Sequence, residues 1–215
     1  MPEELIEAVV AAAPVDSAEN LGEGLIFERE SGIFNYEVVD MKGMDRFQRQ
    51  SDEAYAKFTE TERSATDGYT QADYAVINEA LFDGTWVKKS DIADSVHDID
   101  SAIVKFQLKD DVVAYRGTAS EYFVGWNVGS VKSYDAYMST SFSKGVAQEF
   151  ADNRAAGGRD SMIIEIEVPR GTRGLYIGSN SDVGVDEAEF LLGRGQNFRV
   201  KERTNNFMKL EVVHD

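Results

Sequence analysis

Residues 111–117 read Asp-Val-Val-Ala-Tyr-Arg-Gly, and the sequence changes its pattern at this stretch. Upstream, charge-rich segments with apolar residues at helical spacing predict a helix over residues 47–63, a second from a Thr70 cap to Leu81, and a third along the apolar stripe 92–103. Downstream, short apolar runs separated by Gly, Ser and Asn predict strands. Helices first and strands later favour an α+β fold with a mainly antiparallel sheet.

The apolar runs of the second half place the expected strands. They lie at residues 112–115, 137–140, 162–168, 189–192, 198–200 and 208–213. One helix is expected among them, from a Ser143 cap through Phe150. The alternating acids Glu165 and Glu167 are expected to face solvent, because the aliphatic residues between them supply the inward face of their strand.

Length and composition suit one compact domain. The chain has 215 residues and 42% hydrophobic content, enough to build a core. We expect residues 46–215 to form this domain and residues 1–45 to form an N-terminal extension, in which residues 3–13 can make a short helix.

Charge and cysteine content exclude several classes of function. A net charge of -17 opposes binding to nucleic acid or to anionic lipid, so neither is an expected partner. With no Cys and only two His, the sequence predicts no disulfide, no thiol nucleophile and no metal centre. The start of the chain lacks a cationic n-region, and no apolar run approaches the length of a membrane span, so a cytoplasmic location is expected.

Two carboxylates open the run at residues 187–192, which read Glu-Ala-Glu-Phe-Leu-Leu. On a strand the side-chain period is two, so Glu187 and Glu189 are expected to project from one face. There, like charges can raise a carboxyl pKa and support chemistry at a sugar carbon. Two further motifs lie upstream, at residues 115–117 (Tyr-Arg-Gly) and 139–141 (Ser-Thr-Ser). Each motif alone is common in proteins without a functional role, and only their combination in this order indicates a functional site.

In this order the motifs resemble those of the Arg-Ser-Glu class of mono-ADP-ribosyltransferases, in the exoenzyme branch that includes binary toxins and T-even bacteriophage enzymes. That family also has a Tyr-x4-Tyr-x3-Asn helix over the nicotinamide pocket, which Tyr69, Tyr74 and Asn78 match. The resemblance covers roughly residues 60–213. It implies N-terminal helices followed by a mainly antiparallel two-sheet core.

The resemblance implies NAD as co-substrate, without a metal. Arg116 would hold the pyrophosphate, because a planar guanidinium can pair with phosphate oxygens as a fork, and Gly117 follows it in the cofactor site. Glu189 would stabilise the positive charge that develops on the ribose as nicotinamide leaves, and Ser139 would orient that carboxylate.

Further roles follow from the same resemblance. By the family rule Glu-x-Glu implies an arginine acceptor, which Glu187 can hold by its guanidinium. Phe150, eleven residues after Ser139, would stack on nicotinamide. Arg154 or Arg159 would add a second phosphate contact.

The expected function is therefore NAD-dependent transfer of ADP-ribose to an arginine of a target protein, by an enzyme of phage or bacterial-effector type. The transcription or translation machinery of a host is a plausible class of target. Two alternatives are an NAD glycohydrolase that uses water as acceptor, and a catalytically silent acidic binding protein. Gly184 stands where many relatives place an aromatic residue that contacts the target, which leaves the identity of the target open.

Overall fold

The computed structural model describes residues 36–181 and 187–214, and in them helices precede the sheet as expected. The α-helices are α2 (Met41–Tyr55), α3 (Glu60–Gly68), α4 (Tyr74–Phe82), α5 (Ser90–Ile103) and α6 (Lys144–Ala156). The shorter helical turns are the π-helical η1 (Tyr69–Asp73) and the 3-10 turns η2 (Trp86–Lys88), η3 (Ser120–Phe123) and η4 (Gly178–Asn180). The helix expected over residues 3–13 lies outside the described residues.

The strands include all six that the sequence predicts. They are β1 (Glu37–Val38), β2 (Val112–Ala119), β3 (Val131–Tyr134), β4 (Met138–Ser141), β5 (Ser161–Val168), β6 (Gly174–Tyr176), β7 (Glu189–Leu192), β8 (Gln196–Arg203) and β9 (Phe207–Val213). The prediction did not include β1, β3 and β6, which have two to four residues each and too little pattern to be recognised.

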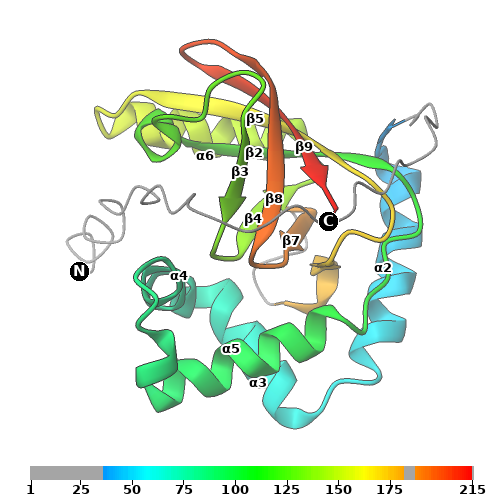
Figure 1. Cartoon of the computed structure of the whole chain (residues 1–215). Helices are drawn as coiled ribbons and strands as arrows, with labels where there is room; N and C mark the ends of the chain where they lie inside the picture. Colours follow the sequence, from blue (N-terminus) through cyan, green and yellow to red (C-terminus); the bar gives the residue numbers. More distant parts are fainter. Residues whose placement is uncertain (1–35, 182–186, 215) are drawn as a thin grey trace, which may run out of the picture.

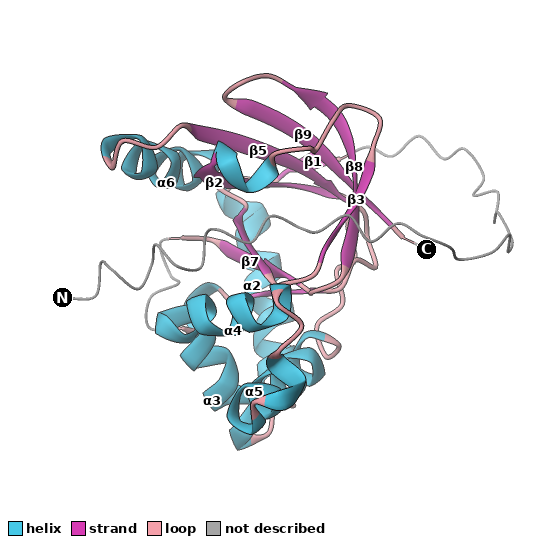
Figure 2. Ribbon diagram, turned by 60° about the vertical axis from the view of Figure 1, so that its left-hand side comes forward, coloured by secondary structure: helices cyan, strands magenta, loops and turns pink. Residues whose placement is uncertain are grey.

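The strands form a mainly antiparallel sheet in the order β3-β8-β9-β5-β2-β4-β7-β6, with β1 beside β2. Only the β1–β2 and β5–β9 pairings are parallel within the described part of the chain. β2 joins β4 through the single residue pair Tyr115 and Ser141. The expected two-sheet core is thus present as two segments of one hydrogen-bonded sheet, which meet at this pair. In Figure 2 the segment with β5, β8 and β9 lies above, and β7 lies below it, nearer the helices.

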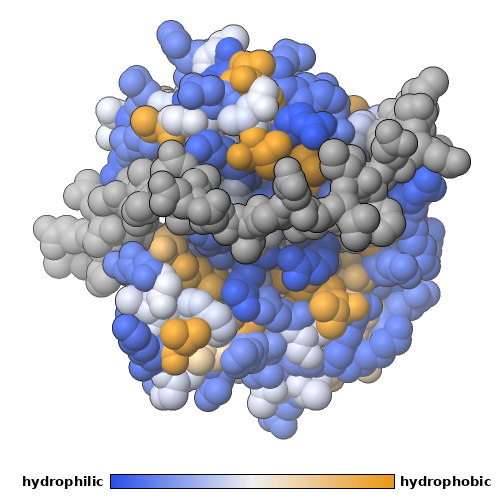
Figure 3. Space-filling model, in the orientation of Figure 1, coloured by the Kyte–Doolittle hydropathy of each residue, from blue (hydrophilic) through white to orange (hydrophobic). Residues whose placement is uncertain are grey.

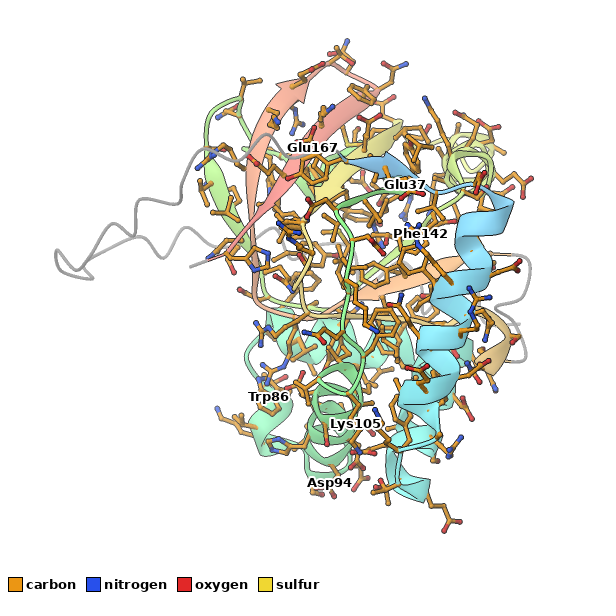
Figure 4. The ribbon with its side chains drawn as sticks, turned by 90° about the vertical axis from the view of Figure 1, so that its right-hand side faces the viewer. Glu37, Trp86, Asp94, Lys105, Phe142 and Glu167 are labelled. Carbon is orange, nitrogen blue, oxygen red and sulfur yellow. The ribbon has the colours of Figure 1, made fainter. Side chains whose placement is uncertain are left out.

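Helices cover the sheet on different sides. α3, α4 and α5 gather below the sheet in Figure 1, whereas α6 lies against β2 and β5. The predicted apolar stripe of α5 faces the core, since Val96, Ile99 and Ile103 are buried. α2 runs along one side of the molecule, beside the labelled Phe142 (Figure 4). Phe47 of α2 packs on the ring of Phe142, with ring centroids 4.8 Å apart.

The helices expected over residues 47–63 and 70–81 are divided differently. The first is wrong, because α2 ends at Tyr55 and Thr59 caps a new helix, α3. Glu62 closes this capping box by accepting from the backbone N–H of Thr59 at 2.7 Å. Thr70 is not a cap either: it lies inside η1, through which α3 continues into α4.

The prediction for Glu165 and Glu167 is also wrong. Glu167 is only 7% exposed, and its carboxylate pairs with Lys201 at 2.6 Å and with Lys209 at 3.0 Å. Lys209 also reaches Glu165 at 3.0 Å, because the parallel register of β5 and β9 places these two residues opposite each other. The acids form an ion-pair row rather than a solvated face.

The expected domain boundary after residue 45 falls inside α2. Upstream of α2, β1 pairs with β2, and Glu37 forms a 2.7 Å ion pair with Arg46. No helix in the described ranges is long and apolar enough to span a bilayer. The face in Figure 3 is mainly hydrophilic, with small separate apolar patches.

Candidate active site

All ten residues predicted for the site line one cleft of about 280 Å³ between the helical layer, the sheet and α6. They are Tyr69, Tyr74, Asn78, Arg116, Gly117, Ser139, Phe150, Arg154, Glu187 and Glu189. The sequence motifs are far apart in the chain, so the fold brings them together.

Strand register places one residue from each of the three motifs side by side. Ser141 of β4 lies opposite Tyr115 of β2 on one side and opposite Glu189 of β7 on the other. The guanidinium of Arg116 then donates from Nη1 to the backbone carbonyl of Ser139 at 2.6 Å. Backbone pairing therefore fixes one residue of each motif, Tyr115, Ser141 and Glu189, relative to the others.

Glu189 is a buried carboxyl group with a strongly shifted pKa. Only 8% of the residue is exposed, and burial raises its pKa from the ordinary 4.5 to about 7. Within this net shift, a hydrogen bond from Ser139 and the positive charge of Arg116 lower the pKa, whereas the negative charge of Glu187 raises it. Such a poised carboxyl group is characteristic of a catalytic position.

Glu187 lines the cleft from a turn and not, as the sequence predicted, from a strand. β7 begins only at Glu189, and Glu187 lies in a turn in which Ala188 has a φ of 44°. The hydroxyl of Ser141 donates to the backbone carbonyl of Glu187 at 2.6 Å and holds this turn. The two acids therefore share a cleft, but not because they alternate along one strand. Burial also raises the pKa of Glu187.

The tyrosine motif depends on the π-helical turn. Residues five apart lie on different faces of an α-helix, but a π turn with i→i+5 hydrogen bonds brings them to one side. The rings of Tyr69 and Tyr74 accordingly lie 6.5 Å apart at 69°. Tyr69 is buried and its hydroxyl accepts from Asn78 Nδ2 at 3.0 Å, whereas Tyr74 is 40% exposed. Tyr69 and Asn78 therefore build the wall that presents Tyr74.

α6 supplies the opposite wall. Phe150 and Arg154 are four residues apart on this helix and line the cleft together, with Phe150 44% exposed. Arg159 is outside the cleft lining; its guanidinium donates to the hydroxyl of Tyr122 at 2.9 Å. Of the two predicted alternatives, Arg154 is the one in the cleft.

Several cleft residues were not predicted, notably Thr70, Thr118 and Tyr122. Thr118 follows Arg116 at the strand period of two, which was a usable signal. Thr70 and Tyr122 come from a π turn and a 3-10 turn, and no local sequence pattern marks either. The described residues contain no group of His, Asp and Glu side chains suited to a metal ion. Gly184 lies outside the described residues.

Comparison with known proteins adds independent relationships. The chain is 32% identical over 182 residues to the NAD(+)–arginine ADP-ribosyltransferase EFV of Enterococcus faecalis, a match that covers 83% of this chain and 36% of that protein. The chain thus corresponds to about a third of the length of this relative.

Two solved structures share the fold. Plx2a, an ADP-ribosyltransferase toxin from Paenibacillus larvae, is 21% identical with a TM-score of 0.68, over 80% of this chain and 96% of that one. The ADP-ribosyltransferase Vis, a toxin from Vibrio splendidus, was solved in complex with agmatine; it is 25% identical with a TM-score of 0.61, over 80% of this chain and 84% of that one.

The chain also matches a family as a whole. Residues 44–212, from the first turns of α2 to the end of β9, match the sequence model of the ADP-ribosyltransferase exoenzymes. Since this match extends over most of the chain and includes all the cleft residues, the chain belongs to the ADP-ribosyltransferase exoenzyme family.

Proposed function

We propose that this protein is an NAD-dependent mono-ADP-ribosyltransferase that modifies arginine side chains of a target protein and releases nicotinamide. The observation that carries the proposal is the presence of Glu187 and Glu189 in one cleft with Arg116 and Ser139. The name of the Enterococcus faecalis relative supports both NAD and arginine as substrates. The complex of Vis with agmatine supports a guanidine acceptor, since agmatine carries the same group as an arginine side chain.

The cleft has the donors that a pyrophosphate needs. Arg116 uses Nη1 for the Ser139 carbonyl, while its buried Nε has no hydrogen-bond partner in the part of the chain that the structure describes. Buried donors are rarely left unpaired, so an anionic ligand at this guanidinium is a natural partner. Arg154 lines the same cleft and can add a second positive charge.

Glu189 is suited to stabilise the transition state in which the glycosidic bond of NAD breaks. As the bond from ribose C1 to the nicotinamide nitrogen breaks, the electron pair leaves with nicotinamide and the ribose becomes oxocarbenium-like. A carboxylate fixed next to the ribose stabilises this positive charge without reorganising. Ser139 holds the carboxylate by its hydrogen bond, and burial keeps water from weakening the interaction.

Glu187 is suited to bring the acceptor to the ribose. It is partly exposed, so its carboxylate can accept hydrogen bonds from an incoming guanidinium. One guanidinium nitrogen then attacks C1 and loses one proton, and the product keeps a single positive charge. The carboxylate of Glu187, whose pKa is raised by burial, can accept that proton.

The acceptor in this proposal is an exposed arginine on a cytoplasmic protein of a host. We would first examine proteins of the transcription and translation machinery. The net charge of -17 favours a basic surface around the target arginine, because opposite charges steer the encounter.

The proposal is tested by incubating the wild-type protein and Glu189→Ala with labelled NAD, agmatine and a host-cell lysate. We expect labelled agmatine and hydroxylamine-sensitive labelling of protein with the wild type only. Free ADP-ribose that depends on Glu189, without a labelled acceptor, would favour the glycohydrolase instead. No turnover and no thermal stabilisation by millimolar NAD would favour the silent binding protein.

A further inference from the structure

One buried threonine of the cleft has a hydroxyl without a protein partner. Thr118 is 2% exposed and lines the cleft, yet its hydroxyl makes no hydrogen bond within the residues that the structure describes. Its oxygen is not fully enclosed, as the unpaired Nε of Arg116 is, so it is open to the cleft. Buried polar groups are nearly always hydrogen-bonded. The partner that this hydroxyl lacks is therefore a group of a bound ligand.

Thr118 lies on the same face of β2 as Arg116. Side chains two residues apart in a strand project to one side and lie about 7 Å apart. Beyond Thr118 the chain turns into η3, in which Tyr122 also lines the cleft. Along β2 and η3 the cleft therefore has a guanidinium, then a hydroxyl and then an aromatic ring.

The two ends of the cleft are bordered by different elements. β4 joins β2 through Tyr115, so β4 and the neighbouring β7, which begins at Glu189, lie on the near side of Arg116. Thr118 and Tyr122 lie past Arg116, away from that pairing. In the proposed function Glu189 is beside the nicotinamide ribose and Arg116 holds the pyrophosphate. The adenosine of NAD then continues toward Thr118 and Tyr122.

α6 extends in the same direction. It begins shortly after β4 ends and passes Gly117, where a Cβ would lie 1.8 Å from the carbonyl oxygen of Ala147. After α6 ends, Arg159 donates to the hydroxyl of Tyr122 at 2.9 Å and holds the ring in place. Burial raises the pKa of Tyr122, whereas the positive charges of Arg159 and Arg154 lower it. Arg154, in the last turn of α6, thus lies at the Tyr122 end of the cleft.

We infer that Thr118 is a specificity-determining residue for the co-substrate: its hydroxyl forms a hydrogen bond with a hydroxyl group of the adenosine ribose of NAD, beside the ring of Tyr122. The inference rests on the proposed function. The spacing fits, because Thr118 is one strand repeat, about 7 Å, beyond the residue at the pyrophosphate, and a ribose links pyrophosphate to adenine. A ribose hydroxyl can donate to a threonine or accept from it, so the pair satisfies both groups.

This role can be separated from a role in folding. Since the Thr118 hydroxyl supports no other group in the described ranges, Thr118→Val should unfold, without ligand, at the same urea concentration as the wild type or a higher one. Thr172 is the matched control: it is equally buried at 2%, lies outside the cleft lining, and donates to the backbone carbonyl of Pro169 at 2.6 Å. Thr172→Val should unfold at a lower urea concentration and bind ADP-ribose as the wild type does.

The test is the Kd of ADP-ribose, which calorimetry measures without turnover. We expect Thr118→Val to bind ADP-ribose about three- to tenfold more weakly than the wild type, as for the loss of one hydrogen bond. Thr118→Ser keeps the hydroxyl and should bind within about twofold of the wild type. An ADP-ribose analogue without hydroxyl groups on the adenosine ribose should bind the wild type and Thr118→Val with the same Kd, because the partner of Thr118 is then missing.

Three results would overturn the inference and leave the proposed function in place. The first is an unchanged Kd of ADP-ribose in Thr118→Val. The second is an equal weakening of ADP-ribose and the analogue, which would place the hydroxyl at the pyrophosphate. The third is a weaker Kd together with the loss of stability expected for Thr172→Val, which would indicate a role in the fold. A wild-type protein that binds no ADP-ribose would overturn the proposed function, and this inference with it.

Discussion

Glu187 and Glu189 face one cleft from two kinds of backbone: Glu189 opens β7, whereas Glu187 lies in a turn closed by Ala188 with a φ of 44°. The strand ladder fixes Glu189, while the hydroxyl of Ser141 fixes the turn of Glu187 at 2.6 Å. Because their supports differ, the two carboxylates can serve separate steps, and each can be changed without displacing the other.

Glu187→Gln should separate transfer from NAD cleavage. An amide keeps the size of the side chain but cannot accept a bidentate guanidinium or take up the released proton. We expect kcat/KM for agmatine to fall by about two orders of magnitude or more, with NAD cleavage retained within about fivefold. Labelled agmatine and free ADP-ribose, measured in one reaction, give both rates. Equal loss of both activities would contradict this division of roles.

NAD cleavage should depend on the ionisation of Glu189. Its pKa of about 7 makes the carboxylate a minority species below neutral pH. We expect kcat/KM for NAD to rise about tenfold per pH unit up to about pH 7 and then level off. Glu187→Gln removes the negative neighbour that raises this pKa, so the midpoint of the profile should move to lower pH. A profile that is flat from pH 5 to 8 would exclude Glu189 as the titrating group.

Glu189→Gln should stabilise the fold above neutral pH while it abolishes NAD cleavage. The native carboxyl, with its raised pKa, binds a proton between pH 4.5 and 7 that the unfolded chain has already lost. The free energy of unfolding therefore falls as pH rises through this window and stays low above it. Removing the charge should recover about 2–3 kcal/mol at pH 8, measured by urea unfolding, and nearly nothing at pH 4. A variant less stable than wild type at pH 8 would contradict the burial penalty.

Arg116→Lys should weaken NAD binding although the charge is kept. An ammonium cannot reproduce the fork that donates to the Ser139 carbonyl and has further donors for phosphate. We expect KM for NAD to rise about tenfold or more. Arg170→Lys, at an exposed position after β5, is the matched control and should leave KM unchanged. An unaltered KM in Arg116→Lys would remove Arg116 from the pyrophosphate site.

The sequence was most informative where local pattern and long-range packing agree. The residues Arg116, Ser139 and Glu189 lie in or next to short apolar runs, and all three runs form strands that meet in the sheet. The break before α3 was also readable, because Thr59 and Glu62 have the spacing of a capping box. The prediction missed this break because the apolar residues over 47–63 keep helical spacing and indicate one continuous helix.

Other features depend on partners that no local pattern reveals. The burial of Glu167 follows from the parallel β5–β9 pairing, which brings Lys209 to it from more than 40 residues away in the chain. The π turn that aligns Tyr69 with Tyr74 has no sequence signature of its own. Ala188 has a positive φ, a backbone conformation that alanine rarely adopts, so its sequence gives no hint of this turn. Such strained positions are concentrated at functional sites.

Gly117→Ala should show how tightly α6 closes the cleft. A Cβ at residue 117 would lie 1.8 Å from the backbone carbonyl oxygen of Ala147 and 2.6 Å from the amide nitrogen of Ala151. Backbone atoms cannot turn aside as a side chain can, so α6 would have to move away from β2, carrying Phe150 and Arg154 with it. We expect a loss of about 2–4 kcal/mol in the free energy of unfolding and a raised KM for NAD.

The control for this substitution lies on the same helix. At Gly145, in the first turn of α6, a Cβ would meet only Ser143 Oγ at 3.6 Å, an ordinary contact. Gly145→Ala should therefore stabilise the helix by up to about 1 kcal/mol, because alanine restricts the unfolded chain more than glycine. Urea unfolding of both variants separates the effect of the β2–α6 contact from the general effect of replacing glycine by alanine. If Gly117→Ala lowers the free energy of unfolding while Gly145→Ala raises it, the constraint lies at the β2–α6 contact. A Gly117→Ala variant as stable as wild type would mean that α6 can move away from β2 at no cost and does not hold the wall of the cleft.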